Sequence, residues 1–250
     1  MSSARGEPLA KVTPGQNATT RRPRRTSGPR YGLLLLVLIA TYLLSAFTDG
    51  QWVISVQILA FVFTLVLALR NALVPKRIAT AALAVVLVGS AVVAELALSS
   101  PSDTTLGAAQ IWIGLILLVT VIMIVRRVLA ESSVTLQSIY GALAAYMIIG
   151  LMFAAFYAAM DHLGGVSFFA NGSPGNTRTF QYFSFTTLTT LGYGDFTAAS
   201  NAGRAVAVME AMAGQIFLAT LVARLVSAFR PPQPPEPPEG GERREQETRQ

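Results

Sequence analysis

Residues 189–195, with the sequence TTLGYGD, combine residue types that suit the coordination of a dehydrated cation. Gly192 and Gly194 flank Tyr193, so residues that tolerate positive φ alternate with a residue that carries a side chain. Successive backbone carbonyls can therefore turn the same way, and the Thr190 hydroxyl adds an oxygen at one end. A column of oxygens that faces one axis can replace the hydration shell of an ion. The segment predicts ion coordination by the backbone, and no catalytic constellation accompanies it.

The same segment resembles the T-V-G-Y-G-D signature of potassium channels, with Leu191 in the valine position. The resemblance implies that the carbonyls of Thr190, Leu191, Gly192 and Tyr193 and the Thr190 hydroxyl bind K⁺, and that Gly194 completes the selectivity filter. It implies K⁺ as the bound species and no organic cofactor. The alternative, an ordinary glycine turn, depends on what surrounds the segment.

Long apolar segments surround this motif. Hydrophobic residues make up 52% of the chain and charged residues 13%. A helix of about 20 apolar residues crosses a hydrocarbon core of about 30 Å. Six segments approach or exceed that length, four before the motif region and two flanking it: 31–47, 52–69, 78–98, 108–125, 136–160 and 202–229.

The expected fold is an all-α membrane protein with six transmembrane helices, a re-entrant pore helix and a filter. Four loops must surround one ion, so the chain is expected to form a homotetramer. The expected domains are a disordered basic N-terminus (1–30), a four-helix transmembrane domain (31–130), a pore domain (131–230) and a disordered tail (231–250).

Basic residues predict the orientation in the membrane. Arginines and lysines gather before the first span, between the second and third, and after the fourth and sixth, which places both termini in the cytoplasm of a multi-pass cell-membrane protein. The net charge of +6 therefore needs no nucleic acid to explain it. The cluster from Arg21 to Arg30 is expected to contact anionic lipid headgroups.

The region before the motif predicts the pore helix. Residues 177–189 are too short to span a membrane and carry the aromatic residues Phe180, Tyr182, Phe183 and Phe185. Non-helical backbone is tolerated at membrane depth only where protein buries it or where it lines water. The helix and the motif together satisfy that condition.

The last span resembles the inner helix of prokaryotic potassium channels. The resemblance implies a gating hinge at Gly214 and a pore lining of Leu218, Val222 and Val226. Gly214 has a second interpretation, because glycines in membrane helices also permit close helix packing.

Two features depart from the family pattern near the motif. Many members carry a glutamate where this chain has Thr186, so Asp195 lacks that partner; Thr186, Thr187 and Asp195 are still expected to support the filter. Glu210 lies at membrane depth, where an ionisable residue is costly. We expect it either to hydrogen-bond Ser184, Thr186 or Thr187 from behind the filter, or to face water.

The front half lacks the charges of a voltage sensor. Residues 108–125 contain no basic residue, and Arg126 and Arg127 are expected to anchor the span at the membrane boundary. Glu95 has no obvious cationic partner. His162 suggests either a pH sensor or an exposed residue without a role.

The expected function is passive, K⁺-selective conduction without strong voltage gating, and not an enzymatic activity. Three alternatives remain open at this stage: a weakly selective cation channel, a potassium transporter subunit, and a non-conducting membrane sensor or interaction protein.

Overall fold

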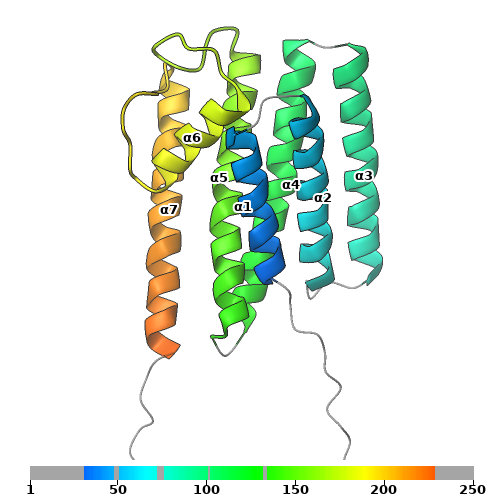
Figure 1. Cartoon of the computed structure of the whole chain (residues 1–250), viewed down its shortest axis with the longest axis vertical. Coiled ribbons are helices and arrows are strands. Elements are labelled where there is room, and N and C mark those ends of the chain that lie inside the picture. The colour runs from blue at the N-terminus through cyan, green and yellow to red at the C-terminus, as the bar shows by residue number, and fades with distance from the viewer. Residues whose placement is uncertain (1–30, 48–50, 72–75, 101, 132–133, 229–250) are drawn as a thin grey trace, which may run out of the picture.

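The computed structural model describes residues 31–47, 51–71, 76–100, 102–131 and 134–228, and these residues form seven helices. Figure 1 shows how the helices are arranged. Six helices run roughly along the long axis, and the short α6 crosses obliquely near one end. Their bounds are α1 Tyr31–Phe47, α2 Gln51–Asn71, α3 Lys76–Ser99, α4 Asp103–Ala130, α5 Leu136–Gly164, α6 Thr177–Leu188 and α7 Asn201–Ala228.

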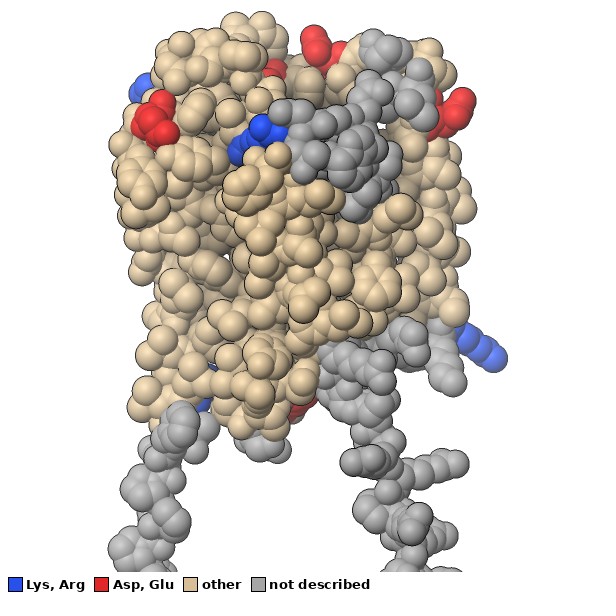
Figure 2. All heavy atoms as spheres, viewed as in Figure 1, with Lys and Arg blue, Asp and Glu red and all other residues tan. Residues whose placement is uncertain are grey.

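The predicted apolar segments correspond closely to these long helices. By length and composition, α4, α5, α7 and residues Ala79–Leu96 of α3 can each cross a membrane. Helix α1 and residues Leu59–Leu69 of α2 are apolar but shorter than the other four. In Figure 2, charged side chains gather toward the two ends, and the middle of the visible face carries none. The chain is therefore an all-helical, multi-pass membrane protein.

The main hydrophobic core lies where α1 and α4 pack on α5. Gly141 of α5 permits close contact there, because an added Cβ would lie 2.9 Å from Val128 and 3.2 Å from Tyr31. Gly150 permits a second close contact, since an added Cβ would lie 2.6 Å from the ring of Phe185 on α6. Small residues thus let the helices approach closely at these two positions.

The predicted terminal segments 1–30 and 231–250, and with them the arginine cluster, lie outside the described residues. Helix α3 lies at the far side of the molecule from α7 (Figure 1). Helix α4 contacts α2, α3 and α5, and so connects the front helices to the part of the chain that carries the motif.

Candidate functional site

Helix α6 points its C-terminal end at the motif. Asn176 caps the N-terminus: its side chain accepts a hydrogen bond from the Thr179 amide at 3.0 Å, while Thr179 Oγ1 accepts one from the Asn176 amide at 2.9 Å. Phe180 and Phe183 are buried in an aromatic cluster with Tyr157 of α5. The cap defines where α6 begins, and the buried aromatic face holds the helix against α5, so together they set the position of its C-terminal end.

The chain leaves α6 in a conformation that few sequences can hold. Thr190, Gly192 and Gly194 have positive φ values of 58°, 49° and 81°. The amides of Leu191 and Gly192 both donate to the Thr186 carbonyl, at 2.8 and 3.1 Å. The Thr190 amide donates to the carbonyl of Thr187 at 2.9 Å. Thr186 and Thr187 therefore hold the start of the motif through their backbone carbonyls.

The outer end of the motif is held by a residue that the sequence interpretation did not assign. Tyr182 on α6 donates its hydroxyl to Asp195 Oδ2 at 2.9 Å, and its ring stacks on Tyr193 with 6.5 Å between centroids and 4° between planes. Asn171 Nδ2 donates to the Asp195 carbonyl at 3.2 Å. Tyr182 precedes Thr186 by one helical turn. It therefore lies on the same face of α6 as Thr186, the position at which many potassium channels carry the glutamate partner of the aspartate.

The inner end of the motif contacts α7, and the last residue of α6, just before the motif, contacts α5. Gln215 Nε2 donates to Thr190 Oγ1 at 3.2 Å, and Tyr146 donates its hydroxyl to the Leu188 carbonyl at 3.2 Å. A Cβ added to Gly214 would lie 2.3 Å from the same Leu188 oxygen. Gly214 thus allows α7 to touch the last turn of α6, which supports the packing interpretation of this glycine; a hinge there stays a proposal.

Glu210 is fully buried and hydrogen-bonded. Its Oε1 lies 2.5 Å from Ser184 Oγ of α6, and its Oε2 accepts from the Tyr157 hydroxyl of α5 at 2.6 Å. The contact expected with the polar face of α6 is therefore present, and it is made to Ser184. The alternative, a Glu210 side chain turned to water, is wrong for this structure. Tyr157 is a second residue that the sequence interpretation did not assign.

The Glu210 cluster has more short contacts than hydroxyl protons. Ser184 Oγ lies 2.6 Å from the Gly150 carbonyl as well as 2.5 Å from Glu210, and Tyr157 supplies the third short contact. Two hydroxyl groups have two protons for three hydrogen bonds. All three bonds are satisfied together when the Glu210 carboxyl group donates to Ser184, Ser184 donates to Gly150, and Tyr157 donates to Glu210.

The residues expected to line the inner pore share one face of α7 at a spacing of four residues. Within a single chain Val222 and Val226 are 56% and 66% exposed, while Leu218 is half-buried. The motif side chains Leu191 and Tyr193 are also exposed, at 55% and 68%. Apolar residues exposed singly are common on protein surfaces, so these exposures by themselves assign no function.

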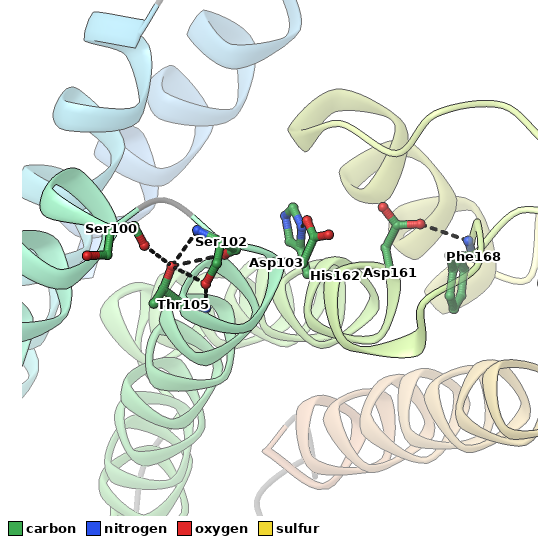
Figure 3. A network of polar contacts seen from close by, with 7 residues as sticks. All are labelled: Ser100, Ser102, Asp103, Thr105, Asp161, His162 and Phe168. Atoms are coloured by element: carbon green, nitrogen blue, oxygen red, sulfur yellow. Dashed lines mark hydrogen bonds and ion pairs between the residues drawn. The ribbon is translucent and has the colours of Figure 1, made fainter.

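His162 lies at the end of α5, close to the start of α4. Its Nδ1 is 3.5 Å from Asp103 Oδ1, whereas the adjacent Asp161 turns away and accepts a hydrogen bond from the Phe168 amide at 2.8 Å (Figure 3). Asp103 is 83% exposed, and surface ion pairs of this kind contribute little to stability.

Comparison with known proteins identifies the part of the chain that contains this site. Residues 146–230 match the family model described as an ion channel. The chain is also 36% identical over 84 residues to a protein named two pore potassium channel b from Oryza sativa subsp. japonica, a match that covers 33% of this chain and 21% of the relative. No solved structure matches significantly.

The chain is thus similar to an ion channel domain over residues 146–230, which comprise most of α5 together with α6, the motif and α7. The relative is named as a potassium channel, and the match covers 21% of its length.

Proposed function

We propose that the chain is one subunit of a homotetrameric, K⁺-selective channel that conducts passively. Four copies of residues 190–194 would surround one axis and coordinate K⁺ through the carbonyls of Thr190, Leu191, Gly192 and Tyr193 and the Thr190 hydroxyl. The observation that carries the proposal is the motif backbone, in which positive φ values at Thr190, Gly192 and Gly194 follow directly on the end of α6.

The position of α6 supports the same proposal electrostatically. Its last carbonyls form the partially negative end of the helix dipole, which stabilises a nearby cation. In a tetramer, four such ends would face the cavity below the filter. The contacts of Thr186, Asp195 and Glu210 would hold each filter strand in register, at its inner end, outer end and back respectively.

The exposed residues of a single subunit support the tetramer. Leu191 and Tyr193 are more than half exposed, and the non-helical backbone that carries them is tolerated at membrane depth only against protein or a water-filled cavity, whereas the exposed Val222 and Val226 of helix α7 would also be stable facing lipid. Contact with neighbouring copies would cover part of this face and leave the remainder to line the pore.

The orientation and the domains belong to the proposal as well. Six spans, α1 to α5 and α7, would place both termini in the cytoplasm and the loops around residues 165–176 and 195–200 outside, in keeping with the basic residues at the opposite end. The front domain, residues 31–130, would serve as a scaffold for the pore domain, residues 131–230, and the arginine cluster from Arg21 to Arg30 would contact anionic headgroups.

Flux through purified protein tests the proposal. The full chain, reconstituted in liposomes loaded with K⁺, is expected to pass K⁺ into a K⁺-free bath, and a planar bilayer with K⁺ on one side and Na⁺ on the other is expected to give a reversal potential close to the K⁺ equilibrium value. A reversal potential near zero would favour the weakly selective cation channel. Absence of flux from correctly assembled tetramers would favour a non-conducting sensor.

A further inference from the structure

An apolar cavity of about 430 Å³ lies between α4, α5 and α7, away from the motif. This volume falls within the range of about 300–1,000 Å³ found for small-molecule sites. Its wall is almost wholly hydrocarbon and comes from all three helices: Val125 and Val128 of α4, Ala145 and Ile149 of α5, and Phe217 and Leu221 of α7. The cavity therefore offers space for a flexible apolar chain.

The cavity has a cationic group at one end. Arg224, in the last turns of α7, belongs to the lining. Its Nη2 donates to the backbone carbonyl of Glu131, at the end of α4, at 2.6 Å. Its Nη1 is buried and has no hydrogen-bond partner within the described part of the chain. One half of the guanidinium group is therefore held in place while the other half is unsatisfied.

The guanidinium group also lacks a counter-charge. The carboxylate of Glu131 accepts instead from Ser138 Oγ at 2.6 Å, and no described carboxylate lies within 4.0 Å of Arg224. Burying a charged group without a partner is costly, and arginine suits phosphate because its fork of N–H groups binds two oxygens at once. The geometry calls for an anionic oxygen group at Nη1, beside an apolar space.

We propose that this cavity binds an anionic phospholipid, with the phosphate on Arg224 Nη1 and part of an acyl chain between α4, α5 and α7. Arg224 lies at the end of the molecule where Arg126 and Arg127 also lie, which is the cytoplasmic end in the proposed orientation, and anionic lipids are enriched in that leaflet. The proposal rests on Arg224 and does not involve the arginine cluster of residues 21–30, which lies outside the described residues. It does not require the chain to conduct K⁺.

Native mass spectrometry of the full-length protein, with added phosphatidylglycerol or phosphatidylcholine of the same acyl chains, tests the site. The unmodified protein is expected to retain phosphatidylglycerol in preference to phosphatidylcholine, by about tenfold. Arg224→Gln is expected to abolish that preference. Arg77→Gln removes an exposed arginine from α3 and is the matched control, for which the preference is expected to be unchanged.

A second variant keeps the test decisive if Arg224→Gln fails to assemble. Ala213→Phe fills the cavity from α7 and retains Arg224, and it is expected to lower phosphatidylglycerol retention about tenfold. Equal retention of both lipids by the unmodified protein would overturn the proposal. So would lipid binding that appears only after removal of residues 231–250, because that result would mean that a carboxylate of that segment, and not a lipid, occupies Arg224 in the full chain.

Discussion

At the scale of single residues, the motif depends on backbone conformations that most side chains disfavour. Thr190 adopts a φ of 58° although it is β-branched, and the hydrogen bond from Gln215 to its hydroxyl helps to hold it. Such a conformation persists only where surrounding contacts enforce it. Here those contacts come from the carbonyls of Thr186 and Thr187 and from α7.

Replacement of Gly192 by alanine tests the importance of this backbone. An added Cβ meets no atom within 4 Å, but the φ of 49° costs a residue with a side chain about 1–2 kcal/mol. The carbonyls are expected to turn away, and K⁺ flux in liposomes is expected to fall about tenfold or more. Gly172→Ala is the control, because Gly172 also has positive φ, 73°, and free space around it, yet lies in the outer loop. Equal loss of flux in both variants would contradict the assignment.

The Glu210 cluster makes a prediction about hydrogen-bond donors. Glu210→Gln is expected to preserve thermal stability, because a carboxamide can accept from Tyr157 and donate to Ser184, which leaves the Ser184 proton for the Gly150 carbonyl. Glu210→Leu leaves the buried Tyr157 hydroxyl without a partner and is expected to destabilise the protein by about 1–3 kcal/mol. Thermal unfolding in detergent measures both, with Tyr157→Phe as a milder reference. A glutamine variant as unstable as the leucine variant would show that the carboxyl group does not donate to Ser184.

At the scale of helices, α6 is held in place by two neighbours that approach its C-terminal end. Tyr146 of α5 donates to the Leu188 carbonyl, and Gly214 of α7 lies against the same oxygen. The end of α6 sets where the motif begins. Displacement of either helix would therefore move the carbonyls that are proposed to bind K⁺.

Gly214→Ala tests that contact. The new Cβ would lie 2.3 Å from a backbone oxygen, so one helix must shift, and overpacking of this kind costs about 1–3 kcal/mol. We expect a lower unfolding temperature together with reduced K⁺ flux. Gly164→Ala, at the end of α5 where an added Cβ meets nothing within 4 Å, is expected to change neither. A variant with full stability but altered opening would favour a hinge at Gly214.

Helix α4 makes a prediction about voltage. Its only basic residues are Arg126 and Arg127, next to each other near its end. Each elementary charge that crosses the field contributes about 2.3 kcal/mol per 100 mV, and no regular series of charges is present in this helix. Open probability is expected to vary only shallowly with voltage in planar bilayers. Steep activation that requires several gating charges would refute this interpretation of α4.

At the scale of the whole molecule, the proposed filter needs more than one chain, because four loops must surround one ion. The motif backbone is non-helical, and such backbone is tolerated at membrane depth only where protein buries it or where it lines water. Fourfold assembly would supply that environment, and it would also repeat every residue of the outer mouth four times around the axis.

Block by external tetraethylammonium tests whether four copies of residue 197 surround the outer mouth. Thr197 is exposed beside the outer end of the motif and offers no aromatic ring, so weak block is expected. Thr197→Tyr would place four rings around one cation, and cation–π attraction of up to about 2 kcal/mol predicts an affinity gain of about tenfold or more. Two dose–response curves on reconstituted channels measure this gain. Tight block of the unmodified protein, or no gain from tyrosine, would argue against a fourfold ring at Thr197.

The helical membrane class, the limits of the long helices and the position of the motif could all be predicted from the sequence. These properties follow from local causes: runs of apolar residues long enough for a bilayer, and glycines spaced for positive φ. The matching ion channel family, at residues 146–230, agrees with that local information.

The side chains that support the motif could be identified only from the way the helices pack. The sequence offered Ser184, Thr186 and Thr187 as partners of Glu210 without distinguishing them, and it gave no reason to select Tyr157 or Tyr182. These contacts depend on the angle at which α6 meets α5 and α7. That packing brings Tyr157 and Ser184, which precede Glu210 by 53 and 26 positions in the sequence, to the Glu210 carboxyl group. The cavity at Arg224 likewise depends on helix packing. Its wall is formed by α4, α5 and α7 together, so the sequence of any one of these helices does not indicate it.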